Sequence, residues 1–362
     1  MSSRTGVQTE VRWPEAAADY EELRVVTGAR SGVTIAIAVH STVLGPALGG
    51  ARMWHYESPA DGIEDALRLA RAMTYKAAAA GLALGGGKGV ICAPAPKRPE
   101  GELRRAILLD FGDAVASLGG KYVTAEDVGT GSADMAVIAE RTSHVVGLPG
   151  ERGGSGDPSP VTARGVLASL RACLEHRFGD PSLKGVRVCV IGAGHVGSRL
   201  ARLLANGGAE VTLSDVDPSR RTLAEELGAA WVEPADAILT DCDVLAPCAL
   251  GGVIDATTVD RLRCEIVCGS TNNVLADDRL AVDLTRRGIF YAPDFIANAG
   301  GLINVYAELH HLDRAGVSAL VDHIGATIAL VLDAAERHGT TPLAEAQSLA
   351  LERLRGGAAA AA

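Results

Sequence analysis

The sequence has few aromatic residues and no uninterrupted hydrophobic run of the length that crosses a membrane. Aromatic side chains make up 4% of the chain, although 48% of its residues are hydrophobic. Alanine and glycine are abundant instead, which indicates close packing of backbone segments. A membrane span needs about 18 consecutive apolar residues, and the segment Met1–Gly6 lacks the apolar core of a signal peptide. We therefore expect a cytoplasmic protein with no membrane partner.

Positive charge is also scarce. The chain has 34 lysines and arginines against 44 acidic residues, and its formal net charge is -10. Nucleic acids are bound through clustered positive charge, so we exclude them as partners. Seven cysteines in a chain of this size require no disulfide framework. The spacings of Cys242/Cys248 and Cys264/Cys268 match no zinc pattern, and we expect no metal.

The length of 362 residues allows two domains. The segment 147–160 is rich in Gly, Ser, Asp and Pro, which indicates a hinge. We predict an α/β fold with a cleft between an N-terminal substrate domain, 1–149, and a doubly wound cofactor domain, 150–335, in which strands and helices alternate. Residues 336–362 are predicted to form a helix that returns to the first domain and ends in a disordered tail. No element is predicted before residue 32.

Two lysines lie near glycine-rich segments of the first domain. Lys88 follows Gly85-Gly86-Gly87, predicted as a loop, and Lys76 lies near the end of a helix that begins at Ser58-Pro59. If both face one cleft, repulsion and burial favour a neutral amine, so one lysine could act as a base while the other binds an anion. A second glycine pair, Gly49-Gly50, is predicted to form a turn that offers N–H groups to an anion. A flexible loop with solvated lysines and an ordinary turn remain open alternatives.

Asp127 follows a predicted strand and precedes Gly129, where a site carboxylate could lie. Aspartate at a strand end more often caps a turn, so this position is ambiguous from the sequence.

The second domain opens with a strand, a glycine fingerprint, a helix, a second strand and an acid in that order. Gly192 permits a tight turn, Gly194 admits a pyrophosphate, and Gly197 lets the helix pack on the sheet. Asp215 lies where an acid accepts the ribose hydroxyls, which favours NAD. The nearby Arg220-Arg221 pair leaves NADP open. Within the fingerprint, His195 and Val196 are expected beside the cofactor.

Three more segments follow strands of the predicted parallel sheet, where ligands bind in this fold. They begin at Ala246-Pro247-Cys248, at 269 and at 293. We expect Ala246, Cys248 and Asn298 to line the cofactor. The pair His310-His311 is expected on a helix, in a surface or packing role.

Taken together, these segments resemble the glutamate/leucine/phenylalanine/valine dehydrogenases, which are amino-acid dehydrogenases. The resemblance covers about residues 30 to 310 and is greatest to the leucine and valine enzymes. The similar segments are Leu44–Trp54, Ala72–Lys76, Gly85–Lys88, Thr124–Thr130, Gly156–Thr162, Ala246–Gly252, Asn272–Asn273 and Ala292–Val305.

The resemblance implies a role for each of the candidate site residues. Lys76 would bind the substrate carboxylate beside Gly49-Gly50, Lys88 would activate the water that attacks the imine, and Asp127 would move the proton at the substrate nitrogen. Asn273 would lie near substrate and nicotinamide, and Thr162 near the nicotinamide. The implied reaction converts an L-amino acid, NAD and water into a 2-oxo acid, ammonium and NADH in a homo-oligomer. The opposing hypothesis is a non-catalytic NAD-binding sensor on the same fold.

The resemblance also implies a pocket for the substrate side chain, lined by Leu48, Ala125, Leu302 and Val305. An unpaired carboxylate would be costly there, so glutamate should be a poor substrate. Ala125 is typical of the branched-chain enzymes and Leu302 of the phenylalanine enzymes. Departures from the family pattern at Ala51, Ala77, Gly131-Ser132 and Tyr306-Ala307 affect the expected substrate and leave the catalytic groups in place. We predict leucine, valine or isoleucine, with phenylalanine as the alternative and tryptophan still open.

Overall fold

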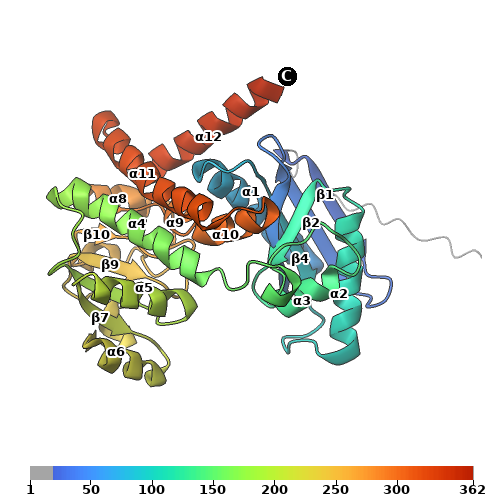
Figure 1. The fold of residues 1–362 in the computed structure, drawn as a ribbon, viewed down its shortest axis with the longest axis horizontal. Helices are drawn as coiled ribbons and strands as arrows, with labels where there is room; N and C mark the ends of the chain where they lie inside the picture. Colours follow the sequence, from blue (N-terminus) through green and yellow to red (C-terminus); the bar gives the residue numbers. More distant parts are fainter. Residues whose placement is uncertain (1–18, 362) are drawn as a thin grey trace, which may run out of the picture.

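The computed structural model describes residues 19–361, which form two α/β domains (Figure 1). The predicted two-domain α/β fold is therefore confirmed. The segment Met1–Gly6, on which the expectation about a signal peptide rests, lies outside the described residues. The predicted hinge, which contains the short 3-10 helix η2 (Gly150–Arg152), connects the domains.

The first domain is built on a five-stranded sheet with the order β1-β2-β4-β3-β5. β1 and β2 are antiparallel, as are β2 and β4, whereas β3 runs parallel to both β4 and β5. The elements are β1 (Glu22–Thr27), β2 (Thr34–Ser41), β3 (Ala47–Trp54), α1 (Pro59–Ala79), β4 (Gly85–Cys92), α2 (Gly101–Ala116), β5 (Tyr122–Glu126) and α3 (Ser132–Ile138). β1 was not predicted from the sequence; it is a partly exposed edge strand whose residues show no clear alternation of burial.

Both glycine-rich segments of this domain are strands, so the predicted loop and turn were wrong. Gly85–Gly87 open β4, and Gly49-Gly50 lie within β3. A Cβ atom on Gly86 would lie 2.1 Å from the backbone nitrogen of Thr74 in α1, and one on Gly87 would lie 2.7 Å from the Tyr122 ring. Successive residues of a strand face opposite sides. The missing side chains therefore let α1 approach one face of β4 and Tyr122 the other.

Helix α1 begins as the sequence predicts. Ser58 and Asp61 form a capping box, and Pro59 occupies the first turn. Its buried face, which includes Ala66 and Ala70, packs on the sheet and directs the last turn, with Lys76, toward the second domain.

The second domain contains a six-stranded sheet with the order β11-β10-β9-β6-β7-β8. All neighbouring strands in this sheet are parallel, which confirms the doubly wound sheet. The strands are β6 (Arg187–Ile191), β7 (Glu210–Ser214), β8 (Ala230–Trp231), β9 (Val244–Pro247), β10 (Ile266–Val267) and β11 (Phe290–Tyr291). The helices are α4 (Ser159–Phe178), α5 (His195–Asn206), η3 (Pro218–Arg220), α6 (Arg221–Leu227), α7 (Pro234–Ala237), η4 (Val259–Arg261), α8 (Leu280–Arg286), α9 (Asp294–Ala297) and α10 (Gly300–Leu309).

Two long helices, α11 (Arg314–His338) and α12 (Pro342–Ala361), complete the chain. α12 contacts α1, and Arg353 Nη1 donates hydrogen bonds of 2.7 Å to the carbonyl oxygens of Ala78 and Ala79. The helix continues to Ala361, so the predicted disordered tail was wrong over 356–361. Alanine is the best helix former, and Gly357 lies against Leu44 of the first domain.

Within residues 19–361, α11 is the one helix whose length and composition would allow it to cross a membrane. The absence of an uninterrupted apolar run did not exclude such a helix, because α11 contains Asp322 and His323 within an otherwise apolar stretch. Ile324, Ile328 and Val331 of α11 are buried in the main hydrophobic cluster, and the helix packs along α4. These contacts are typical of a core helix in a globular domain.

Candidate active site

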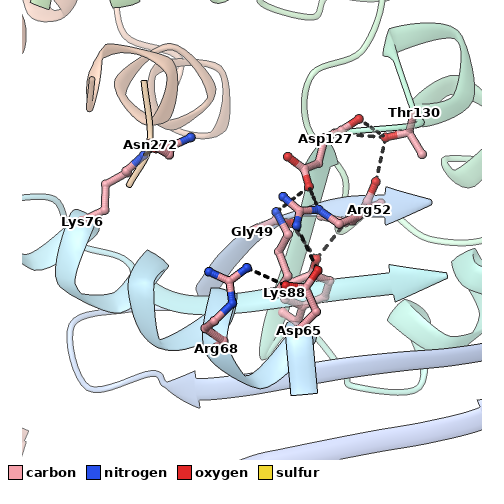
Figure 2. Close-up of polar contacts among 12 residues, drawn as sticks. Gly49, Arg52, Asp65, Arg68, Lys76, Lys88, Asp127, Thr130 and Asn272 are labelled. Carbon is pink, nitrogen blue, oxygen red and sulfur yellow. Dashed lines mark hydrogen bonds and ion pairs between the residues drawn. The ribbon is translucent and has the colours of Figure 1, made fainter. Parts of the chain in front are cut away.

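An ion pair joins Lys88, which is buried on β4, to Asp127, which directly follows β5 and is partly exposed. Lys88 Nζ is 2.8 Å from Asp127 Oδ2, and the Lys88 side chain is only 6% exposed. The same carboxylate oxygen accepts a hydrogen bond of 2.9 Å from Arg52 Nε on β3 (Figure 2). The backbone N–H of Asp127 donates to Thr130 Oγ1, which holds the turn after β5. The strand order brings the three charged side chains together, because β3, which carries Arg52, lies between β4, which carries Lys88, and β5, which Asp127 follows.

The pair is electrostatically coupled. Burial lowers the pKa of Lys88, and the negative charge of Asp127 opposes that shift without reversing it. Burial alone would raise the pKa of Asp127, but the charges of Lys88 and Arg52 outweigh it and lower that pKa. Asp127 is therefore ionised at neutral pH, and Lys88 releases its proton more readily than a lysine in water.

Lys76 lies in the last turn of α1, on the side of the second domain. Its Nζ donates a hydrogen bond of 3.1 Å to Asn272 Oδ1, so the two domains are in direct contact at the predicted cleft (Figure 2). Burial lowers the pKa of Lys76 to about 8; the charge of Asp294 opposes this shift, and that of Lys88 adds to it. The predicted proximity of the two lysines is thus seen in their electrostatic interaction.

The pairing of β3 with β4 is interrupted at Gly49-Gly50, beside Lys88. β3 pairs with β4 at Leu48 and again from Ala51, but not at Gly49-Gly50. The carbonyl of Gly49 accepts a hydrogen bond from the Tyr122 hydroxyl. This stretch therefore has no ladder partners on the side of Lys88, although β5 continues to pair with it on the other side.

The four predicted pocket residues are all buried and belong to one hydrophobic cluster that contains residues of both domains. They are Leu48 on β3, Ala125 on β5, and Leu302 and Val305 on α10. Tyr306 is half-buried, and its ring lies against that of His310 at a centroid distance of 4.2 Å. His310 is exposed and has this packing contact, but His310 and His311 follow the end of α10, so their predicted position on a helix was wrong.

The glycine fingerprint has the geometry that a dinucleotide requires. Gly192 has a φ of 100°, which favours glycine, and a Cβ atom on Gly197 would lie 1.8 Å from the Gly192 carbonyl oxygen. A Cβ atom on Gly194 would have no neighbour within 4 Å, so space is open at the N-terminus of α5. Anions bind favourably at such helix N-termini, and the residues present fit the phosphates of a dinucleotide. His195 and Val196 form the first turn of α5, where His195 is exposed.

Asp215 follows β7 as predicted and organises the loop. Its carboxylate accepts hydrogen bonds of 2.7 Å from the N–H of Ala193 and 2.8 Å from that of Asp217. Arg220 lies 3.6 Å from Asp217, and Arg221 forms an ion pair with Glu233. Both arginines that could bind a 2′-phosphate are therefore already paired with acids.

The other residues predicted to bind the cofactor belong to three separate parts of the second domain. Ala246 lies near the end of β9 and Cys248 directly follows that strand, and the Cys248 N–H donates to the carbonyl oxygen of Ile191 at the fingerprint. Thr162 on α4 faces the start of α10, where a Cβ atom on Gly301 would lie 3.3 Å from its Oγ1. Asn298 donates to Asn272 Oδ1 at 2.8 Å, while its own buried Oδ1 has no partner among the described residues and is free to accept one.

Sequence reasoning missed three polar side chains at this site. Asn272 contacts Lys76, whereas Asn273, which was predicted near the substrate and nicotinamide, is exposed with a φ of 52°. Asp294 is buried, accepts from the Val274 N–H, and has its pKa raised by burial. Arg52 binds Asp127. Their positions at strand ends or in the glycine-paired segment were the available signals. No cluster of metal-binding side chains occurs in residues 19–361.

Comparison with known proteins identifies relatives along most of the chain. Residues 17–144 match the profile of the Glu/Leu/Phe/Val dehydrogenase dimerisation domain, and residues 220–356 match the Glutamate/Leucine/Phenylalanine/Valine dehydrogenase profile. Residues 166–250 also match the NAD-binding domain of D-isomer specific 2-hydroxyacid dehydrogenases. This match and the glycine fingerprint indicate a nicotinamide cofactor.

Individual relatives cover nearly the whole chain. A leucine dehydrogenase of Thermoactinomyces intermedius is 44% identical over 93% of this chain and 91% of its own length. A valine dehydrogenase of Streptomyces coelicolor is 42% identical, with 92% of each chain covered. The crystal structure of L-tryptophan dehydrogenase from Nostoc punctiforme superposes with a TM-score of 0.82 at 35% identity, over 94% of this chain and 97% of that one. The chain therefore belongs to the glutamate/leucine/phenylalanine/valine dehydrogenase family of oxidoreductases.

Proposed function

We propose that this enzyme catalyses the reversible, NAD-dependent oxidative deamination of a branched-chain L-amino acid to its 2-oxo acid and ammonium. The observation that carries the proposal is the buried Lys88–Asp127 pair, with a second lysine, Lys76, close enough to interact with it electrostatically. We assign 1–149 to the substrate domain and 150–335 to the cofactor domain. We further propose a cytoplasmic enzyme.

The two lysines have different tasks in the proposed mechanism. Lys76 remains protonated and binds the substrate carboxylate in place of its contact with Asn272, beside the Gly49-Gly50 backbone. NAD, when bound, accepts the hydride that leaves the substrate α carbon. Lys88 takes a proton from the water that attacks the resulting imine carbon. Asp127 moves the proton that the nitrogen gains before ammonia leaves.

Cofactor choice rests on Asp215. A carboxylate at the end of β7 accepts ribose hydroxyls and repels a 2′-phosphate. The ion pairs of Arg220 and Arg221 with neighbouring acids support the same preference. We therefore propose NAD rather than NADP.

The apolar pocket supports a branched-chain substrate. Leu48, Ala125, Leu302 and Val305 offer no charge to a second carboxylate, and burial of one would cost several kcal/mol. An aromatic substrate is the second candidate, because Leu302 is typical of phenylalanine enzymes and the superposed Nostoc enzyme is a tryptophan dehydrogenase. A methylene more or less changes binding by about 1–3 kcal/mol in such pockets, so several apolar substrates should be used.

A homo-oligomer is proposed from the matched dimerisation domain and the partly exposed edge strand β1. A glutamate dehydrogenase with the same fold, from Thermus thermophilus, is described as hetero-hexameric. A monomer in light scattering at micromolar concentration would contradict this assignment.

The function is tested by NADH formation with leucine, valine, phenylalanine, tryptophan and glutamate, each with NAD and with NADP. Leucine or valine with NAD should give the highest kcat/KM. An aromatic substrate in first place would overturn the branched-chain assignment, and glutamate in first place would overturn the pocket. Measurable NAD binding without turnover of any of them would favour the sensor hypothesis.

A further inference from the structure

We infer that Arg52 is a positioning residue, which holds the Asp127 carboxylate in one orientation and maintains its negative charge beside Lys88. The inference rests on the proposed roles of Lys88 and Asp127. It goes beyond them because Arg52 touches neither the substrate nor the cofactor in the proposed mechanism and acts through Asp127.

Arg52 and Lys88 both contact the same oxygen of the Asp127 carboxylate. Arg52 Nε and Lys88 Nζ both lie on Asp127 Oδ2, at 2.9 and 2.8 Å. Among the described residues, Oδ1 of the same carboxylate has no hydrogen bond or ion pair, which leaves it for the substrate nitrogen. Since a carboxylate held through one oxygen cannot rotate freely, Arg52 fixes the direction in which the other oxygen points.

Arg52 also binds a second carboxylate, that of Asp65. Its Nη1 donates a hydrogen bond of 2.9 Å to Asp65 Oδ2 on α1. Asp65 also accepts a hydrogen bond of 2.7 Å from the Tyr56 hydroxyl. It accepts another of 2.6 Å from Arg68 (Figure 2). The guanidinium therefore bridges two carboxylates through separate nitrogens, an arrangement that a lysine ammonium cannot reproduce.

Arg52 also sets the charge balance of the pair. Burial raises the pKa of Asp127, and Arg52 together with Lys88 more than offsets this. Burial lowers the pKa of Lys88, and Arg52 adds to that lowering. Loss of the guanidinium should therefore raise both pKa values and move the whole pH profile to higher pH. The charged and titratable groups around Lys88 and Asp127 are Arg52, Lys76, Asp65 and Tyr122.

A cavity of about 540 Å³ gives access for a chemical test. It is lined by Arg52, Tyr56, Asp65 and Arg68, among others, and is open to solvent. Removal of the Arg52 side chain should extend this cavity toward Asp127. A guanidinium ion from solution can then take the place of the missing group.

The experiment compares Arg52→Ala with the wild type by the pH dependence of kcat and KM for NADH formation. We expect kcat to fall about 10- to 100-fold, as for a misplaced catalytic group, with a smaller change in KM and with both limbs of the profile at higher pH. Millimolar guanidinium should restore part of kcat. Arg105→Ala, which removes a surface ion pair with Glu140, is the matched control and should change neither quantity.

Three outcomes separate the possibilities. An inactive wild type would refute the proposed function, whereas an active wild type with an unshifted Arg52→Ala profile and no rescue would refute the role of Arg52 alone. If Arg52→Ala does not fold, Arg52→Lys carries the test, because it keeps the charge but loses the bridge to Asp65. That variant should have a lowered kcat with an almost unshifted profile, and wild-type kcat in it would overturn the positioning role.

Discussion

Replacement of Lys88 by alanine is the most direct test of the proposed chemistry. The substitution removes the amine 2.8 Å from Asp127 Oδ2 and leaves that carboxylate paired with Arg52. Lys88 is buried at the centre of the sheet, and the neighbouring β4 glycines offer no side chain that could take its place. The perturbation therefore removes the proposed base without removing the partner that holds Asp127.

The expected loss of kcat follows from the proposed role of Lys88 in proton transfer. Proton transfer by a positioned side chain contributes about 10²- to 10⁴-fold to the rate, which corresponds to about 3–5 kcal/mol of transition-state stabilisation. We expect Lys88→Ala to lower kcat by that factor. The loss of folding stability should be below the roughly 3–5 kcal/mol typical of breaking a buried pair, because Asp127 keeps the Arg52 charge and is partly exposed.

The assay is steady-state NADH formation from leucine at several pH values, with thermal unfolding measured alongside. Lys121→Ala is a suitable control, since it removes another lysine that contacts an acid, Glu22, but at an exposed position. It should retain wild-type kcat. If folded Lys88→Ala kept wild-type kcat at its own pH optimum, Lys88 would not be the base, and the mechanism would be wrong.

Two further predictions concern the first domain. Because the pKa of Lys76 is lowered to about 8, its ammonium is present below that pH and lost above it; the kcat/KM for the 2-oxo acid should fall as pH rises through 8, and Lys76→Ala should have a raised KM without this dependence. Gly86→Ala would place a Cβ atom 2.1 Å from the Thr74 nitrogen, so it should destabilise the protein by about 1–3 kcal/mol in denaturant unfolding. Gly150→Ala, where a Cβ atom meets nothing within 4 Å, should be nearly neutral; equal stability of the two variants would refute the packing argument.

The sequence predicted the second domain well because its signals are local. The turn at Gly192, the open space at Gly194 and the close packing at Gly197 are each determined within one strand–turn–helix unit. Asp215 directly follows β7, the next strand, where a dinucleotide-binding unit has its acidic residue. Such features need no knowledge of distant residues, so a single sequence is sufficient to identify them.

The first domain was harder because its glycines serve contacts that are remote in the sequence. Gly86 is required by α1, and Gly87 by Tyr122, neither of which is adjacent to it. Glycine carries no side chain that could show the alternation of a strand, so the sequence indicated a loop. Arg52 was missed for a similar reason, since its partner Asp127 comes 75 residues later and is brought near by the pairing of β3 with β5.

The position of one carboxylate explains why two nearby lysines can have different tasks. Lys88 already has its counter-ion, Asp127, at 2.8 Å. Among the described residues, Lys76 forms no ion pair; it contacts the amide of Asn272 and interacts with the charges of Asp294 and Asp127 only at longer range. A substrate carboxylate that reaches Lys76 supplies the anion that this lysine lacks and so favours its protonated form. The same anion is not needed at Lys88, whose lowered pKa suits proton transfer. Because Asp127 contacts Lys88 and not Lys76, Lys88 is suited to base catalysis and Lys76 to binding the substrate carboxylate.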